Sequence, residues 1–236
     1  MKEWMHPDIG LVVFRKNSRS KRLSLRVRPQ RPVTVTIPTY YPYWMAKKIV
    51  RQHLEWIKEQ QNAQQINAAT KRIDWDTKFE MRDKVLFFQA TKDSAFGLEF
   101  KASNYLISIP ENVDLKSPIT QELLQKMVIE VLRKEAKNYL PSRTNKFAKN
   151  KGIVINQVRI KNMKTRWGSC SSKKNVNFSL YLMLLPDVLI DYVIYHELAH
   201  IKHQNHSAAY WQHLEQLLPG AKQLDAAMKH QQMPFI

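Results

Sequence analysis

The chain has 236 residues, of which 44% are hydrophobic and 10% are aromatic, so it can bury a substantial core and does not resemble a disordered protein. No apolar run approaches the ~20 residues that span a bilayer, and the single cysteine, Cys170, excludes an internal disulfide and a zinc site built on several thiolates. Lys and Arg number 38 against 20 Asp and Glu, and the net charge of +18 favours polyanionic partners such as DNA. Because the N-terminus lacks a signal sequence, we expect a cytoplasmic protein.

Residues 10–37 show the alternation that is typical of a half-buried β-sheet. Apolar residues alternate with polar ones in two runs, at Leu23, Leu25 and Val27 and at Val33, Val35 and Ile37. Eight basic residues and no acidic one lie between Arg15 and Arg31. The simpler interpretation of this stretch is a solvated face of a hairpin, and the alternative is a stripe of cations that follows phosphates.

A helix rich in Gln and Lys is predicted over residues 42–66. Strand character returns over 78–110, where Val85 to Phe88 forms a short apolar run. We therefore predict an N-terminal, β-rich region with one long helix over residues 1–112.

The C-terminal region, residues 113–236, is predicted to begin with a long helix. Ser117 is a suitable N-cap and Pro118 a suitable first helical residue. We expect this helix to end near Leu140, because Pro141 lacks the backbone N–H that the next turn needs.

Beyond this helix, strands are predicted at 153–160 and 175–182. Asp187 is a plausible N-cap for a helix over 188–203, and Ser207 is one for a further helix. The whole chain is therefore expected to be an α+β protein.

The string His196-Glu197-Leu198-Ala199-His200 lies within the predicted helix at 188–203. Two histidines four residues apart stand about 6 Å apart along the axis of a helix, so both imidazoles can reach one metal ion. Glu197 then projects near the same site without binding the metal. This HExxH arrangement predicts a zinc hydrolase with two ligands and a general base. A match of five residues can also arise by chance on a polar helix face.

A catalytic zinc needs a third protein ligand and one open position. His206 is the strongest candidate, because the chain can turn back at Gln204 and Asn205 after the helix, and Asn205 tolerates left-handed geometry. His203 is a weaker candidate, which we interpret as solvated or as a neighbour of the ligands. Three imidazoles and an open position suit zinc better than manganese or cobalt.

Three segments, in order, resemble a known family: TRWGSCS at 165–171, IDYVIYHELAH at 190–200 and NHSAAYW at 205–211. They are similar to those of the YgjP-type predicted metal-dependent hydrolases, which are relatives of the SprT and Wss-like minimal zinc peptidases. The resemblance implies a zincin-like fold in the C-terminal region and peptidase activity. It also implies metal ligands and a catalytic base, at His196, His200, His206 and Glu197. Ser179 stands where the family usually has Asn.

The segment from Arg166 to Cys170 has two interpretations. As an edge strand it could bind an extended peptide by strand addition, and Arg166 could contact a substrate carboxylate or the oxyanion. Alternatively, Trp167 packs in the core and Gly168 allows a close backbone approach. Cys170 is interpreted as a small, buried residue.

These features predict a zinc-dependent metallopeptidase that acts on polypeptides, with Zn²⁺ as its cofactor. One alternative keeps the metal and changes the substrate to a non-peptide amide or ester. Another is a basic, nucleic-acid-binding module whose metal site is structural or vestigial. A peptidase that acts on DNA-bound proteins would combine both features. Integral membrane association is not expected, and the sequence leaves the oligomeric state open.

Overall fold

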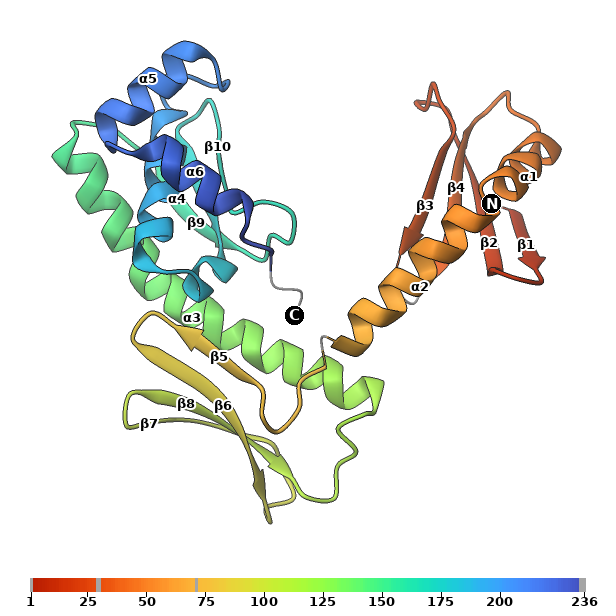
Figure 1. Ribbon diagram of the computed structural model, residues 1–236, viewed down its shortest axis with the longest axis horizontal. Coiled ribbons are helices and arrows are strands. Elements are labelled where there is room, and N and C mark those ends of the chain that lie inside the picture. Colours follow the sequence, from red (N-terminus) through yellow and green to blue (C-terminus); the bar gives the residue numbers. More distant parts are fainter. Residues whose placement is uncertain (1, 29–30, 71, 234–236) are drawn as a thin grey trace. The chain divides into compact units, whose positions relative to one another are not determined.

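The computed structural model describes residues 2–28, 31–70 and 72–233 (Figure 1). The chain forms two compact units, Met1–Arg72 and Ile73–Ile236. Both combine helices with β-sheets, which confirms the predicted α+β class. Within the described residues, no helix is long and apolar enough to cross a membrane.

The N-terminal unit is a four-stranded sheet followed by two helices. The strands lie in the order β1-β2-β4-β3, and β2 and β4 are parallel while the other pairs are antiparallel. Their bounds are β1 Lys2–His6, β2 Gly10–Asn17, β3 Ser24–Arg28 and β4 Arg31–Pro38. The predicted single helix at 42–66 is wrong in one respect, because His53 leaves helical geometry between α1 (Tyr43–Gln52) and α2 (Leu54–Thr70).

The C-terminal unit begins with a second four-stranded sheet, in the order β5-β6-β8-β7. Its strands are β5 Lys78–Met81, β6 Lys84–Thr91, β7 Gly97–Lys101 and β8 Asn104–Pro110. Leu86 and Ile107 of this sheet belong to the same hydrophobic core as Leu132 of the following helix, α3 (Pro118–Asn150). The division between the units therefore falls at residues 72 and 73, and not at the predicted 112 and 113, because the second sheet buries its apolar face with α3.

Helix α3 continues through Pro141 for 33 residues, or about 50 Å, so the predicted end near Leu140 is wrong. Pro141 costs the helix one hydrogen bond, typically about 3 kcal/mol. Buried residues lie on both sides of it, with Leu140 and Ala148 in one core, and their burial offsets that cost. The Thr144 hydroxyl also donates to the Leu140 carbonyl at 2.6 Å.

The rest of the unit is a small sheet with three helices (Figure 1). The sheet has the order β10-β11-β9, so β10 lies at its edge within the described residues. The bounds are β9 Gln157–Lys161, β10 Gly168–Cys170, β11 Asn175–Ser179, α4 Asp187–Ala199, α5 Ala208–Leu217 and α6 Ala221–Lys229. The predicted strand at 175–182 is shorter, because a 3₁₀ turn, η1 (Leu180–Leu184), replaces its end. Asp187 is the first helical residue of α4, and Pro186 occupies the N-cap position that was predicted for Asp187.

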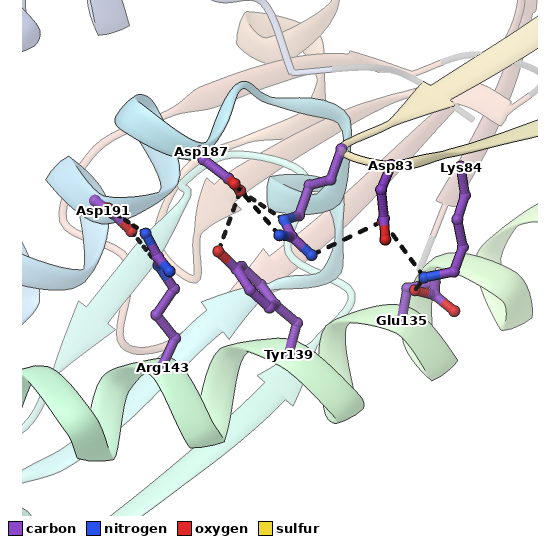
Figure 2. Close-up of polar contacts among 8 residues, drawn as sticks. Asp83, Lys84, Glu135, Tyr139, Arg143, Asp187 and Asp191 are labelled. Carbon is purple, nitrogen blue, oxygen red and sulfur yellow. Dashed lines mark hydrogen bonds and ion pairs between the residues drawn. The ribbon is translucent and has the colours of Figure 1, made fainter. Parts of the chain in front are cut away.

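A network of ion pairs fixes α4 on α3 (Figure 2). Arg143 of α3 donates twice to Asp191 of α4, at 2.5 and 2.6 Å. One turn earlier, Asp187 accepts hydrogen bonds from Arg82 at 2.5 Å and from Tyr139 at 3.1 Å. Arg82 lies in the β5–β6 turn, so the network joins the second sheet, α3 and the first two turns of α4.

We expect Asp191→Asn to lower the free energy of unfolding by about 1–3 kcal/mol, because the Arg143 guanidinium, whose side chain is only 29% exposed, loses its charged partner. Glu130→Gln is the matched control, since Glu130 pairs with Arg133 but is 66% exposed and should contribute below about 0.5 kcal/mol. Urea denaturation of both variants, followed by circular dichroism, measures the difference. Equal losses in the two variants would contradict this role of the pair.

Candidate active site

Helix α4 carries the first two predicted ligands at its C-terminal end. Its apolar residues pack on nearly all sides, and Ile190, Ile194 and Leu198 are fully buried. The helix ends at Ala199, earlier than predicted, but His200 keeps helical backbone angles as the C-cap. His200 therefore remains one turn above His196, and their Nε2 atoms lie 3.3 Å apart.

The third predicted ligand, His206, lies in the loop that connects α4 to α5. Ser207 caps α5 as predicted, accepting a hydrogen bond from the Tyr210 N–H at 3.4 Å. This cap holds the preceding residue, His206, with its Nε2 atom 3.1 Å from that of His196. The positive φ angles of the described non-glycine residues are at Arg82, Ala102, Ser103 and Lys174. The turn before His206 is therefore made without the left-handed Asn205 that the sequence suggested.

The three imidazoles form a group whose possible ligand atoms lie within 4.8 Å of one another. The Nδ1 atom of His200 faces the His203 carbonyl at 3.0 Å, an acceptor that requires a proton on Nδ1. The unprotonated Nε2 of His200 then points at His196. Lone pairs on imidazole nitrogens that face one another repel. A cation placed between the three imidazoles would instead be attracted to the lone pair of each one. The three nitrogen donors therefore fit a metal ion.

Burial also keeps His196 and His200 neutral, which is the form that binds metals. Burial and the neighbouring His200 and His206 lower the pKa of His196 to about 4. Burial likewise lowers the pKa of His200. At neutral pH, protons therefore compete weakly with a metal for these two residues.

The sequence reasoning missed a hydrogen-bonded chain behind His196. The Tyr192 hydroxyl lies 3.2 Å from His196 Nδ1 and donates to Asp225 Oδ1 at 2.8 Å. Lys229 pairs with the same carboxylate at 2.6 Å. The Tyr192 hydroxyl donates its proton to Asp225, so its oxygen can only accept a hydrogen bond from the Nδ1–H of His196. The Nε2 atom of His196 is then unprotonated and has a lone pair for a metal ion. The i, i+4 spacing of Tyr192 and His196 was a local signal, but Asp225 comes from α6 and only the tertiary structure brings it here.

We expect Tyr192→Phe to weaken metal affinity by about 10- to 100-fold, because His196 loses the partner that fixes its orientation and tautomer. The matched control is Tyr195→Phe, on the same helix, since Tyr195 stacks on Phe147 away from the three histidines. Competition with a chromogenic zinc chelator measures both affinities without any substrate. Wild-type affinity in Tyr192→Phe would exclude the role of this chain in metal binding.

Glu197 follows His196 in α4 and is almost inaccessible, with 4% of its surface exposed. Its Oε2 atom has no hydrogen-bond partner among the described residues. Burial raises the pKa of Glu197 to about 8, and the charge of Arg166 opposes this rise. A buried, unpaired carboxyl group with such a pKa is typical of acid–base sites.

The edge strand β10 passes directly over Glu197. A methyl group on Gly168 would lie 2.4 Å from Glu197 Oε1 and 2.7 Å from its Cγ, closer than van der Waals contact allows. Only glycine therefore permits this approach of strand and carboxylate. The sequence interpretation of Gly168 as a point of close backbone approach agrees with this geometry.

The other candidates have different surroundings. Arg166 precedes β10 and is exposed. Its positive charge acts on Glu197 and lowers the pKa of that carboxyl group. Cys170 is half-buried, and burial raises the pKa of its thiol to about 11, so it stays protonated.

The buried Ser179 hydroxyl donates to the Met163 carbonyl at 2.8 Å and caps η1, which is a structural role. Tyr210 is fully buried and stacks on His200, with ring centroids 4.7 Å apart.

Comparison with solved structures finds two archaeal metallopeptidase zymogens. Abylysin from Pyrococcus abyssi is 25% identical, with a TM-score of 0.34, over 39% of this chain and 95% of that one. Jannalysin from Methanocaldococcus jannaschii is 24% identical, with a TM-score of 0.32, over 36% of this chain and 89% of that one. No curated protein matches the chain.

The family comparison covers far more of the chain. The model of the YgjP-like metallopeptidase domain matches residues 21–231, which include the three histidines, Glu197 and Gly168. The match extends over both compact units. On this basis, the chain belongs to the YgjP-like family of metallopeptidases.

Proposed function

We propose that the chain is a zinc peptidase in which His196, His200 and His206 hold the metal and Glu197 is the general base. The observation that carries the proposal is the convergence of three Nε2 atoms, together with the buried Glu197, which follows His196 in α4 and whose Oε2 has no partner among the described residues. Zinc bound there would supply Lewis acidity, which activates a water molecule and polarises the substrate carbonyl.

Glu197 performs the proton transfers in this proposal. Its carboxylate accepts a proton from the attacking water and then delivers it to the nitrogen of the departing amine. Burial supports this function because it raises the pKa of Glu197 to about 8, close to a neutral working pH. The passage of β10 over the carboxylate limits its rotamers and holds it in one orientation.

The edge strand β10 is the proposed site for the substrate backbone. One side of β10 pairs with β11, and its other side has no strand partner among the described residues. An extended peptide could add there by main-chain hydrogen bonds. Arg166, two residues before this strand, is proposed to contact a substrate carboxylate or the oxyanion. A cytoplasmic location remains a prediction.

The metal content of the purified chain is the first test. We expect about one zinc per chain in the wild type, measured by elemental mass spectrometry, and a loss of most of it in His196→Ala, because two imidazoles bind zinc far more weakly than three. His230→Ala, at an exposed histidine after α6, is the matched control and should keep its zinc. Equal zinc in wild type and His196→Ala would contradict the ligand assignment.

The zinc-loaded chain should then be assayed on a panel of peptides, with small amides and esters alongside. Cleavage of peptides at a rate that falls after zinc removal supports the proposal. Hydrolysis confined to the non-peptide amides or esters would support the alternative substrate class.

A further inference from the structure

The N-terminal unit carries a positive charge out of proportion to its size. Residues 1–72 contain 15 Lys and Arg against 4 Asp and Glu, a net charge of +11 out of +18 for the whole chain. Between Asp8 and Glu55 there is no acidic residue, whereas that interval contains 11 basic ones. Surfaces that only need solubility mix charges of both signs. The absence of acidic residues over this length therefore indicates an anionic partner.

The two faces of the N-terminal sheet differ in chemistry. Residues that pair across neighbouring strands share a face, and faces alternate along each strand. One face holds Phe14, Val35 and the other apolar residues that form a core with Ala46 and Val50 of α1. The opposite face holds Arg15, paired with Thr36, and Arg26, paired with Thr34. Strand β1 adds Glu3 and Met5 to this face, since they pair with Val13 and Leu11. The face is therefore basic along β2 and β3, whereas its β1 side holds one acidic residue and the apolar Met5, Leu11 and buried Val13.

More cations continue this face at its edges. Arg28 lies on the edge strand β3, and Arg31 opposes it at the start of β4. The loop between β2 and β3 adds Arg19, Lys21 and Arg22. We call the whole set the Arg15–Arg31 surface, and its members are Arg15, Arg19, Lys21, Arg22, Arg26, Arg28 and Arg31. All seven are exposed, and none makes an ion pair within the described part of the chain.

The kind of cation and an adjacent aromatic residue narrow the class of partner. Six of the seven cations are arginines, whose planar guanidinium groups bind phosphates by two parallel hydrogen bonds. Tyr40 is 78% exposed and follows the end of β4. The ends of β2 and β4 are paired at Asn17 and Pro38, so Tyr40 lies at the same end of the sheet as Arg15. Phosphate-binding cations beside an exposed aromatic ring are the combination that binds single-stranded nucleic acid.

We propose that the Arg15–Arg31 surface binds single-stranded nucleic acid, with its cations on the phosphates and Tyr40 stacked on a base. A membrane surface fits less well, because Met5 is the one large apolar side chain that is exposed among the described members of this face, and a single side chain inserts weakly among lipids. Charged side chains also protect edge strands from aggregation. Protection of the edge strand explains Arg26 and Arg28 on β3. It does not explain Arg15 on β2, the cations of the β2–β3 loop or the absence of acidic residues between Asp8 and Glu55. The proposal does not depend on the peptidase assignment.

Fluorescence anisotropy with a labelled, single-stranded DNA of mixed sequence tests the proposal. The full chain is titrated at several salt concentrations between about 50 and 200 mM, with a chelator present so that the metal site takes no part. In Arg15→Gln/Arg22→Gln/Arg26→Gln/Arg28→Gln we expect the affinity at low salt to fall at least about tenfold. The slope of log affinity against log salt should become shallower by about 3, since each lost phosphate contact removes about 0.7.

The matched control removes the same charge from the C-terminal unit. Lys137, Lys146, Lys149 and Lys151 are exposed on or just after α3, and changing all four to Gln should alter the affinity by less than about threefold. Equal losses in the two variants would overturn the proposal, since binding would then follow net charge alone. The absence of saturable binding by the wild type at low salt would also overturn it. Binding to phosphatidylserine vesicles without binding to DNA would instead identify a membrane surface.

Tyr40→Ala supplies a second test that is independent of charge. Because Tyr40 is largely exposed, its removal should leave the fold intact. We expect the affinity for single-stranded DNA to fall about tenfold, and the affinity for a duplex to change little, because stacked bases in a duplex do not offer their faces. Unchanged affinity for single-stranded DNA would contradict the stacking part of the proposal.

Discussion

Replacing Glu197 with glutamine is expected to lower the rate of peptide hydrolysis by about 10²–10⁴-fold, the usual contribution of a general base. The amide has nearly the same shape but cannot accept the proton from water. Since Glu197 is not one of the three converging imidazoles, zinc content should stay at the wild-type level. Steady-state hydrolysis of the best peptide substrate, together with elemental analysis, measures both effects.

The same substitution should not destabilise the fold. Glu197 is 4% exposed and its Oε2 has no partner among the described residues, so burial of its charge is unfavourable. A neutral amide avoids that cost, and we expect Glu197→Gln to melt at or above the wild-type temperature. Glu122→Gln, at an exposed site on α3, is the control and should keep full activity. Normal turnover by Glu197→Gln would disprove its assignment as the base.

Gly168→Ala is the second change with a large expected effect. The new methyl group would lie 2.4 Å from Glu197 Oε1 and 2.8 Å from its Cδ, so the carboxylate must move. A displacement of about 1 Å at a catalytic group can cost about 10²-fold in rate. We expect that loss in the rate of hydrolysis while zinc binding persists, because the three histidines are not displaced.

Two further variants separate this effect from general damage to a strand. Gly97→Ala changes a glycine in β7, where the added methyl group would meet the Ser108 Cβ atom at 3.3 Å and requires only a small local shift, so activity should be retained. In the double variant Gly168→Ala/Glu197→Gln, the rate should be no lower than in Glu197→Gln alone, since both changes disable the same group. Additive losses would show that Gly168 acts through some other part of the site.

The candidate site was largely predictable because its spacing is local. The separation of His196 and His200 by one helical turn follows from helix geometry, whatever the rest of the fold does. The cap at Ser207, which sets the position of His206, is also encoded within a few residues. Strands β3 and β4 follow from period-two alternation and β6 from a short apolar run, whereas β1 at Lys2–His6, which lies outside the predicted range of 10–37, was missed.

The sequence errors occurred where burial outweighed a local preference. Pro141 normally ends a helix, yet α3 continues because apolar residues before and after it belong to one core. The boundary between the units was expected at residues 112 and 113 but lies at 72 and 73. The cause is again burial, because the second sheet buries its apolar face against α3. Both outcomes depend on long-range contacts, which a local pattern does not contain.

By itself, the sequence determined the spacing of the three histidines, the position of Glu197 among them, the α+β class and the concentration of positive charge. Only the tertiary structure decided that Asp225 of α6 supports His196 through Tyr192, and that Gly168 of β10 lies against Glu197. The physical reason is the range of the interactions. Helix periodicity, capping and charge are fixed within a few neighbouring residues, whereas these contacts join residues 29 to 33 positions apart and exist only once the core has packed.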